Sequence, residues 1–223
     1  MRSSRTRRAA FTLVELLVVI GLIALLATTL GVALTGKTGS SLASAQQTVA
    51  ALCGTARAQA ALHQTETRIV VHATRPTTGH SDKYLRVLQV FRAEPDGSDA
   101  WMAAGPPVYL PRGIYLVPPE PGELLATGID WATRPLASSN LASTTGPLGR
   151  AGTEFGDADT VLYLQFGADG LPSILESTAP LVIVVAAGDV STGALQFTDS
   201  ALVRGVAIRR NGSVGFVDRP GGP

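Results

Sequence analysis

A single carboxylate, Glu15, lies inside an otherwise apolar run near the amino terminus. Residues 11–20 read FTLVELLVVI, and no charged residue occurs from Leu16 to Gly36. A charged side chain at the centre of a membrane helix costs about 2.5–3.5 kcal/mol. Glu15 is therefore either a charge tolerated near the edge of the bilayer or a residue with a role that offsets this cost.

A second candidate for chemistry follows directly, because residues 31–38 (GVALTGKT) satisfy the phosphate-loop pattern G-x-x-x-x-G-K-[ST]. That pattern binds phosphate only when a strand leads into the loop and a helix leaves it. Here the preceding residues are typical of an apolar helix, and no series of alternating strands and helices joins the loop to the strand-like LVIVVAAGD ending at Asp189. We interpret the segment as a glycine-rich joint. A nucleotide-binding enzyme is the less favoured hypothesis.

The cysteine and the histidines indicate no nucleophilic or metal chemistry. Cys53 is the only cysteine, so it forms no intrachain disulfide, and we expect it to be a small buried residue. His63 is expected at the boundary of a helix, and His72 and His80 lack the spacing of metal ligands. The chain also lacks a G-x-S-x-G motif, so we predict no enzyme, no cofactor and no metal site.

Two charged pairs have a structural and a functional interpretation. Asp157 and Asp159 lie in a glycine-rich loop, where they cap a turn or bind calcium, and capping is the favoured interpretation. Arg209 and Arg210 precede a turn, and we expect them to be solvated rather than to form a nucleic-acid site.

The distribution of charge predicts a membrane orientation for the amino-terminal segment. The chain has 223 residues and a formal net charge of +1, but four arginines and no acid lie in the first ten residues. The uncharged run after Glu15 would reach roughly 30 Å as a helix, which matches a hydrocarbon core. The basic flank places the amino terminus in the cytoplasm.

Three ordinary interpretations of this segment leave Glu15 without a role. A secretory signal would be cleaved after residues 31–33 (GVA), giving Leu34 as the first mature residue. The Arg7-Arg8 pair is also similar to a twin-arginine signal, and a plain membrane anchor is the third interpretation. None of them requires an acid at this position.

The amino terminus resembles that of type IV prepilins and type II secretion pseudopilins. The matching residues are Arg7-Arg8-Ala9-Ala10, then FTLVE, then LLVVIGLIALLATTL. The resemblance implies that a prepilin peptidase cleaves between Ala10 and Phe11 and methylates the new amine of Phe11. This chain has Ala10 where the family usually has glycine.

The same resemblance assigns Glu15 a role in assembly. It becomes the fifth residue of the mature chain, where its carboxylate meets the amino-terminal ammonium of an adjacent subunit. Such a pair gains roughly 4 kcal/mol at about 4 Å and an effective dielectric near 20. The acid thereby fixes the register of packed helices.

The remainder of the chain predicts one helix followed by an antiparallel sheet. Apolar residues recur at helical spacing over residues 41–63, at Leu42, Ala45, Val49, Leu52, Ala56, Ala60 and His63. Polar residues, including Gln46, fall largely on the other side. We expect strands at 68–73, 84–91, 108–110, 113–117, 161–166, 181–186, 202–209 and 214–217. Asn211-Gly212 predicts a type I′ hairpin turn, and residues 167–170 (GADG) predict another reversal.

The second half of the chain narrows the resemblance to one subgroup of this family. The stretches LCGTARAQAALHQTETRIVVHA, LYLQFGADGLPS, LVIVVAAGD and RGVAIRRNGSVGF are similar to the H-type minor pseudopilins and FimT-like minor pilins. The stretch PVYLPRGIYLVPP also resembles the Verru_Chthon cassette protein D type.

The expected organisation is a cleaved leader over residues 1–10 and a transmembrane assembly helix over 11–35. A flexible joint and amphipathic helix over 36–63 follow, and a sheet domain over 64–223 carries a partly ordered Pro/Gly/Ser-rich loop at about 118–159. The fold class is α+β and pilin-like, with a long amino-terminal helix packed on the sheet.

The expected function is that of a structural subunit, a minor pilin or pseudopilin, of a type IV pilus-like or type II secretion filament. The resemblance implies prepilin peptidase, other pilin subunits, the inner membrane and exported cargo as partners, and it disfavours nucleic acid. The chain would cross the inner membrane once, with its carboxyl-terminal domain in the periplasm. The alternative is an exported or membrane-anchored binding domain without catalytic activity.

Overall fold

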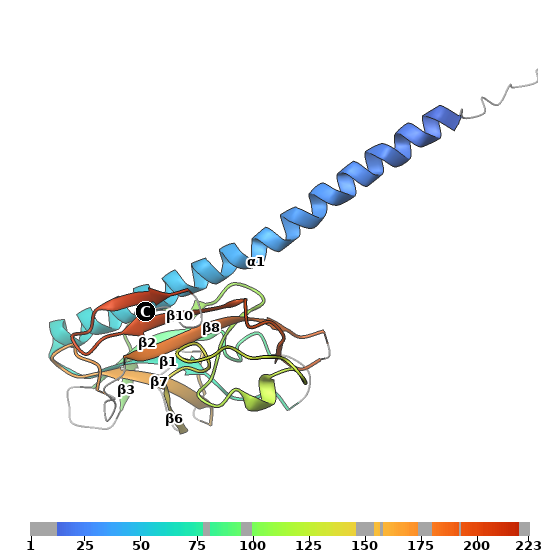
Figure 1. Ribbon diagram of the computed structural model, residues 1–223. Coiled ribbons are helices and arrows are strands. Elements are labelled where there is room, and N and C mark those ends of the chain that lie inside the picture. Colours follow the sequence, from blue (N-terminus) through green and yellow to red (C-terminus); the bar gives the residue numbers. More distant parts are fainter. Residues whose placement is uncertain are drawn as a thin grey trace, which may run out of the picture. The chain divides into compact units, whose positions relative to one another are not determined.

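The computed structural model describes residues 13–77, 81–94, 100–145, 154–156, 158–173, 180–191 and 193–218, with the side chains of 24–37 left out. The chain divides into two compact units between Lys37 and Thr38. The second unit contains the sheets and the carboxyl-terminal part of the helix (Figure 1).

Helix α1, Leu13–His63, is 51 residues long and continuous. Residues 31–38 are part of it, so the phosphate-loop pattern lies on a helix rather than between a strand and a helix. The predicted joint does not interrupt the helix, because no proline occurs between Leu13 and His63. α1 ends where predicted, since Gln64 adopts a left-handed conformation with φ of 54°.

Among the residues that the structure describes, no helix combines the length and the hydropathy that crossing a bilayer requires. The transmembrane segment expected at residues 11–35 includes residues 24–35, whose side chains are outside this description.

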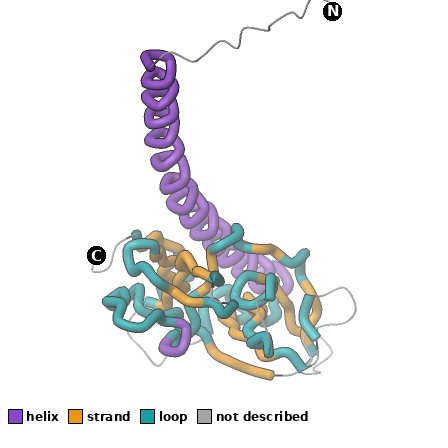
Figure 2. The backbone as a smooth tube through the Cα atoms, turned by 90° about the vertical axis from the view of Figure 1, so that its right-hand side faces the viewer, coloured by secondary structure: helices purple, strands orange, loops and turns teal. Residues whose placement is uncertain are grey.

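Two antiparallel sheets follow α1, where the sequence predicts one (Figure 2). Sheet A has the order β3-β2-β1-β7-β6, with β4 also paired to β2. Its strands are β1 Thr67–His72, β2 Val87–Ala93, β3 Trp101–Ala103, β4 Val108–Tyr109, β6 Ala142–Thr145 and β7 Thr160–Phe166. Sheet B has the order β11-β10-β8-β5, with β9 paired to β8. Its strands are β5 Ile114–Leu116, β8 Leu181–Asp189, β9 Gln196–Phe197, β10 Val203–Ile208 and β11 Val214–Val217.

The central strand of each sheet is paired on both of its edges, which leaves no free edge through which the two sheets could join there. In sheet A, Val70 lies opposite both Gln89 of β2 and Tyr163 of β7, so β1 is paired on both edges. β8 is likewise paired on both edges, with β10 on one side and β5 on the other. The Leu116 N–H donates to the Leu85 carbonyl at 2.8 Å and links β5 to the turn before β2.

The eight predicted strands all exist, but β2 begins three residues later than expected. Leu85 has a φ of 55°, which breaks the extended run. Three short strands, β3, β6 and β9, have no alternating pattern and were not predicted.

The main core lies between residues 42–60 of α1 and the two sheets. The predicted stripe is correct, because Ala45, Val49, Ala56 and Ala60 are fully buried. The prediction for Gln46 is wrong, because this side chain is buried at 4% exposure. Its Nε2 donates to the Gly205 carbonyl at 2.8 Å and to Asp218 Oδ1 at 3.0 Å, which satisfies the amide within the core.

The hairpin between β10 and β11 forms, but its predicted turn type is wrong. Only Gly212 has a positive φ, at 73°. The Gly212 N–H donates to the Arg209 carbonyl at 2.8 Å, so Arg210 and Asn211 are the central residues of the turn. This is a three-residue loop with a left-handed glycine. The reversal at residues 167–170 is confirmed, with Gly170 at φ 75°.

The structure describes the segment after residue 118 continuously up to Thr145. It contains the short 3-10 helix η1, Gly122–Leu124, and strand β6. Leu136 is completely buried, and a Cβ added to Gly205 would lie 2.5 Å from its Cδ2. This segment therefore packs on the face of sheet B that Gly205 presents.

Candidate assembly and processing site

The predicted assembly acid lies at the beginning of α1. Glu15 is the acidic residue of the first helical turn. The carboxylate therefore lies at the positive end of the helix dipole, which stabilises it by about 0.3–1 kcal/mol. Ala10 and Phe11, the predicted cleavage pair, lie outside the described residues.

The first turns of α1 expose a continuous apolar surface. Nine large apolar side chains are between 45% and 82% exposed, namely Leu13, Val14, Leu16, Leu17, Val18, Val19, Ile20, Leu22 and Ile23. Surface of this kind is stable in water only when a bilayer or other protein covers it. Glu15 is the charged residue within it.

The comparisons with known proteins bear on this segment. Residues 5–31 match the family described as the prokaryotic N-terminal methylation motif. The match contains the Ala10–Phe11 step, Glu15 and the apolar run together. The amino-terminal segment of this chain therefore carries this methylation motif.

A solved structure is similar to this chain. The structure is the minor pseudopilin EpsH from the type 2 secretion system of Vibrio cholerae, at 10% identity and a TM-score of 0.38. The match covers 79% of this chain and 95% of EpsH. A similarity at this level does not establish a shared fold, and no match was found among the curated proteins.

A second cluster of polar side chains lies on the face of sheet A that points away from α1. We call it the His72 cluster, and it consists of His72, Thr74, Lys83, Glu154 and Asp159. His72 Nε2 lies 3.5 Å from Asp159 Oδ2, and Thr74 Oγ1 donates to Asp159 Oδ1 at 2.9 Å. Lys83 Nζ lies 2.6 Å from Glu154 Oε2. These contacts fasten the segment around residues 154–159 to sheet A.

Phe155 packs against His72 and Phe91. Its ring is 6.0 Å from that of His72 and 5.6 Å, edge to face, from that of Phe91. His72 Nδ1 is buried and has no hydrogen-bond partner. The imidazole is therefore held in an apolar environment on one side and beside a carboxylate on the other.

The surroundings shift the pKa values of both His72 and Asp159. Burial lowers the pKa of His72, and the nearby Asp159 carboxylate only partly offsets this effect. Burial raises the pKa of Asp159, but the hydrogen bonds from the Gly156 N–H and Thr74 outweigh it, so that the pKa lies below its ordinary value. His72 is consequently neutral and Asp159 ionised near pH 7.

The remaining candidates occupy the places that their structural interpretations predict, where the structure describes them. Cys53 is buried, and burial raises its pKa to about 12, so the thiol is protonated and inert. His63 is exposed at the end of α1. Asp159 caps a turn by accepting the Gly156 N–H at 2.6 Å. Asp157 and His80 lie outside the described residues.

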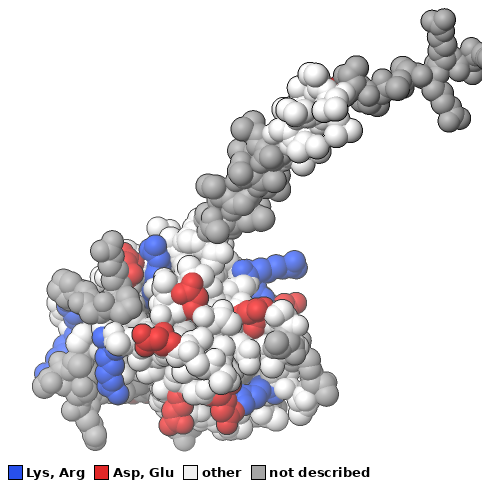
Figure 3. Space-filling view, turned by 45° about the vertical axis from the view of Figure 1, so that its right-hand side comes forward, with Lys and Arg blue, Asp and Glu red and all other residues white. Residues whose placement is uncertain are grey.

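No group of three metal-ligating side chains occurs among the residues that the structure describes. Arg209 begins the β10–β11 turn, whereas Arg210 is one of its two central residues rather than a residue that precedes it. Basic and acidic side chains are interspersed on the face of the molecule shown in Figure 3. This face therefore presents no continuous basic surface of the kind that binds nucleic acid.

Sequence reasoning missed the His72 cluster and the stacking around Arg68. The Arg68 guanidinium lies 3.9 Å from the Trp101 ring centroid and 4.3 Å from that of Tyr163. These residues are far apart in the sequence and meet only through strand pairing. The available sequence signal for these contacts is a polar residue within an otherwise apolar strand, such as Arg68 or His72 in β1.

Proposed function

We propose that this pilin-like protein is a minor subunit of a type IV pilus-like or type II secretion filament. The observation that carries the proposal is the methylation motif over residues 5–31, with Glu15 as the charged residue of an exposed apolar helix. The protein has a structural role in this proposal, and its chemistry is limited to its own processing.

Processing creates a new cation that can pair with Glu15 of an adjacent subunit. Prepilin peptidase cleaves between Ala10 and Phe11, removes the four arginines of the leader and methylates the freed amine. The new ammonium is an amino-terminal cation on an apolar helix, and the carboxylate of Glu15 in an adjacent subunit neutralises it. Either charge alone would be costly in this environment, whereas the pair is favourable.

The motif also supports a membrane-anchored precursor. In the proposed topology the amino terminus lies in the cytoplasm and residues 38–223 lie in the periplasm. The assembled filament then presents the two-sheet domain outward, where it contacts neighbouring subunits and exported cargo.

Replacing Glu15 with Val tests the charge pairing. The Glu15→Val precursor should insert into the membrane as the wild type does, because the change makes the helix more apolar. Its incorporation into filaments should fall by at least about tenfold, since loss of the pair leaves an isolated ammonium. Incorporation is measured by immunoblotting of sheared filaments against membranes.

Glu15→Asp is the matched control, because it keeps the charge and shortens the side chain by one methylene. It should retain more incorporation than Glu15→Val. Sequencing of the mature amino terminus completes the test, with methylated Phe11 expected. A chain that begins at Leu34 would instead support the exported binding domain, and normal incorporation of Glu15→Val would exclude the pairing mechanism.

A further inference from the structure

A pocket with a volume of about 210 Å³ opens on the two-sheet domain, where the segment after β5 meets the beginning of β8. We call it the Arg134 pocket. Its polar lining comes from Arg134, Ser138 and Asn140, and its apolar lining includes Pro135, Pro180 and Leu181. None of the described residues that line it is acidic. A water molecule takes up about 30 Å³ in the liquid, so the pocket is large enough for a small organic group.

The segment that carries the three polar side chains is anchored to the domain. Trp131 Nε1 donates to the Ala137 carbonyl at 2.9 Å, and Leu136 is completely buried. Ser139 Oγ accepts the Val184 N–H of β8 at 2.8 Å. The pocket is therefore formed before any ligand arrives, as ligand pockets usually are.

The polar lining presents hydrogen-bond donors. Asn140 Oδ1 accepts the Val182 N–H at 2.9 Å, which fixes the orientation of the amide and leaves its Nδ2 as a donor. Neither this Nδ2 nor the Ser138 hydroxyl forms a hydrogen bond with the residues that the structure describes. The Arg134 side chain is exposed and has no carboxylate partner among the same residues. A guanidinium, a hydroxyl and an amide N–H₂ group therefore line one pocket together.

A second pocket of the domain shows how the chain itself satisfies an arginine in such a position. This pocket has a volume of about 130 Å³, and Arg75, Tyr84, Glu123 and Leu195 are among its lining residues. Arg75 Nη1 forms an ion pair with Glu123 Oε2. The chain thus supplies a carboxylate to Arg75, whereas the described lining of the Arg134 pocket supplies none.

We infer that the Arg134 pocket binds a carboxylate carried on a short aliphatic stem. The guanidinium fork matches the two oxygens of a carboxylate, and the donors of Ser138 and Asn140 can share them. Pro135 and Pro180 offer apolar surface to the stem, which a bare inorganic anion would leave unused. A small free acid and a glutamate side chain of a polypeptide both present this chemistry. Binding requires no filament, because all lining residues belong to the unit from Thr38.

NMR titration of the uniformly ¹⁵N-labelled, detergent-solubilised full-length chain tests the proposal. The titrants are butyrate, a blocked alanine peptide with one glutamate, the same peptide with glutamine, and inorganic phosphate. The Nε–H signal of Arg134, assigned by its loss in Arg134→Gln, should shift and saturate with butyrate and with the glutamate peptide. Tighter binding of the peptide would indicate a polypeptide ligand, and tighter binding of butyrate a small free acid.

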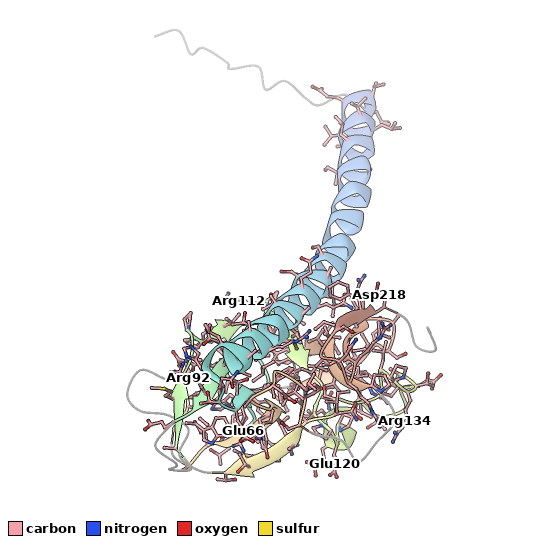
Figure 4. The ribbon with its side chains drawn as sticks, turned by 90° about the vertical axis from the view of Figure 1, so that its left-hand side faces the viewer. Glu66, Arg92, Arg112, Glu120, Arg134 and Asp218 are labelled. Carbon is pink, nitrogen blue, oxygen red and sulfur yellow. The ribbon has the colours of Figure 1, made fainter. Side chains whose placement is uncertain are left out.

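Variants of two arginines show whether the pocket is responsible. Followed through the side-chain amide signal of Asn140, Arg134→Gln should weaken butyrate binding at least about tenfold, because it removes a charge-assisted hydrogen bond. Arg134→Lys should lie between, since a point charge replaces the planar fork. Arg112→Gln is the matched control, because Arg112 is also exposed and lines neither pocket. Figure 4 shows Arg112 and Arg134 well apart on the domain.

Several results would overturn the inference. They are an Arg134 signal that does not saturate, a glutamine peptide that binds as tightly as the glutamate peptide, and phosphate that binds more tightly than butyrate. Unchanged butyrate binding in Arg134→Gln, or an equal loss in Arg112→Gln, would do the same. Because Arg134 is exposed, its substitution should leave the fold intact, and unchanged backbone signals of α1 and both sheets verify this.

Discussion

Glu15 and His72 are the residues whose surroundings matter most for their chemistry. Glu15 lies in the first turn of α1 among exposed apolar side chains, and in the proposed filament its charge pairs with the amino terminus of an adjacent subunit. His72 has its partner inside the subunit, since Asp159 Oδ2 lies 3.5 Å from its Nε2. Glu15 bears on the proposed assembly of subunits, and the environment of His72 predicts how the stability of the domain responds to acid.

The depressed pKa of His72 predicts that acid destabilises the domain. The folded-state pKa lies below the ordinary value of 6.5, so the unfolded chain binds the proton more readily. The contribution of His72 is fully present above about pH 6.5 and is lost as the pH falls from there toward the folded pKa, with a slope of at most about 1.4 kcal/mol per pH unit. Chemical denaturation between pH 7.5 and 5 measures this slope.

Variants of two histidines assign the effect. His72→Gln should flatten the slope, because it removes the titrating group, whereas His63→Gln should leave it unchanged, because His63 is exposed. Glu154 and Asp159 have pKa values below their ordinary 4.5 and 3.8, so they contribute at lower pH. An NMR titration that places the pKa of His72 at or above 6.5 would contradict this account.

At the scale of elements, two turns hold the carboxyl-terminal part of α1. A Cβ on Gly170, in the turn after β7, would lie 3.2 Å from both the Cγ and the carbonyl oxygen of Arg57. Gly212, in the β10–β11 turn, approaches the guanidinium of the same residue. Both glycines have positive φ, and both sheets therefore reach the helix through a position that favours glycine.

Gly170→Ala should destabilise the domain by about 1–2 kcal/mol, because alanine disfavours the left-handed region and crowds the Arg57 carbonyl. Thermal unfolding of the purified protein measures the change. Gly54→Ala, on the exposed side of α1, is the matched control, since nothing lies within 4 Å of its added Cβ. It should stabilise the helix by up to about 1 kcal/mol. Equal effects of the two substitutions would rule out the contact with Arg57.

At the scale of the whole molecule, the chain consists of two units with different requirements. The unit that ends at Lys37 exposes apolar side chains in its described residues, whereas the unit from Thr38 buries a core shared by α1 and both sheets. The first therefore depends on a bilayer or other subunits, and the second has its own core.

Residues 38–223 alone should fold without the preceding segment. Ser40 or Ser41 can cap the new start of the helix, and among the side chains that the structure describes those of the main core all lie after Lys37. The fragment should be soluble and unfold in a single cooperative transition, with a Tm within a few degrees of the same domain in the detergent-solubilised full chain. A fragment without such a transition would show that the first unit is needed for folding.

The sequence by itself determined the features that depend on local order. The FTLVE motif, the apolar stripe of α1, the end of the helix at His63 and the positions of eight strands all follow from periodicity and residue type. These patterns extend over only a few residues, so they can be recognised in a single sequence. The turn at Asn211-Gly212 was located correctly, although its type depended on how Arg209 and Ser213 pair across the hairpin.

Only the tertiary structure decided which distant groups meet. The division into two sheets, the burial of Gln46 against Gly205, the packing of Leu136 and the pairing of His72 with Asp159 all join segments that are far apart in the chain. Strand order and register set these contacts, and a run of alternating residues carries no record of its partner strand. The Arg134 pocket is of the same kind, because its lining comes from the segment after β5 and from the beginning of β8.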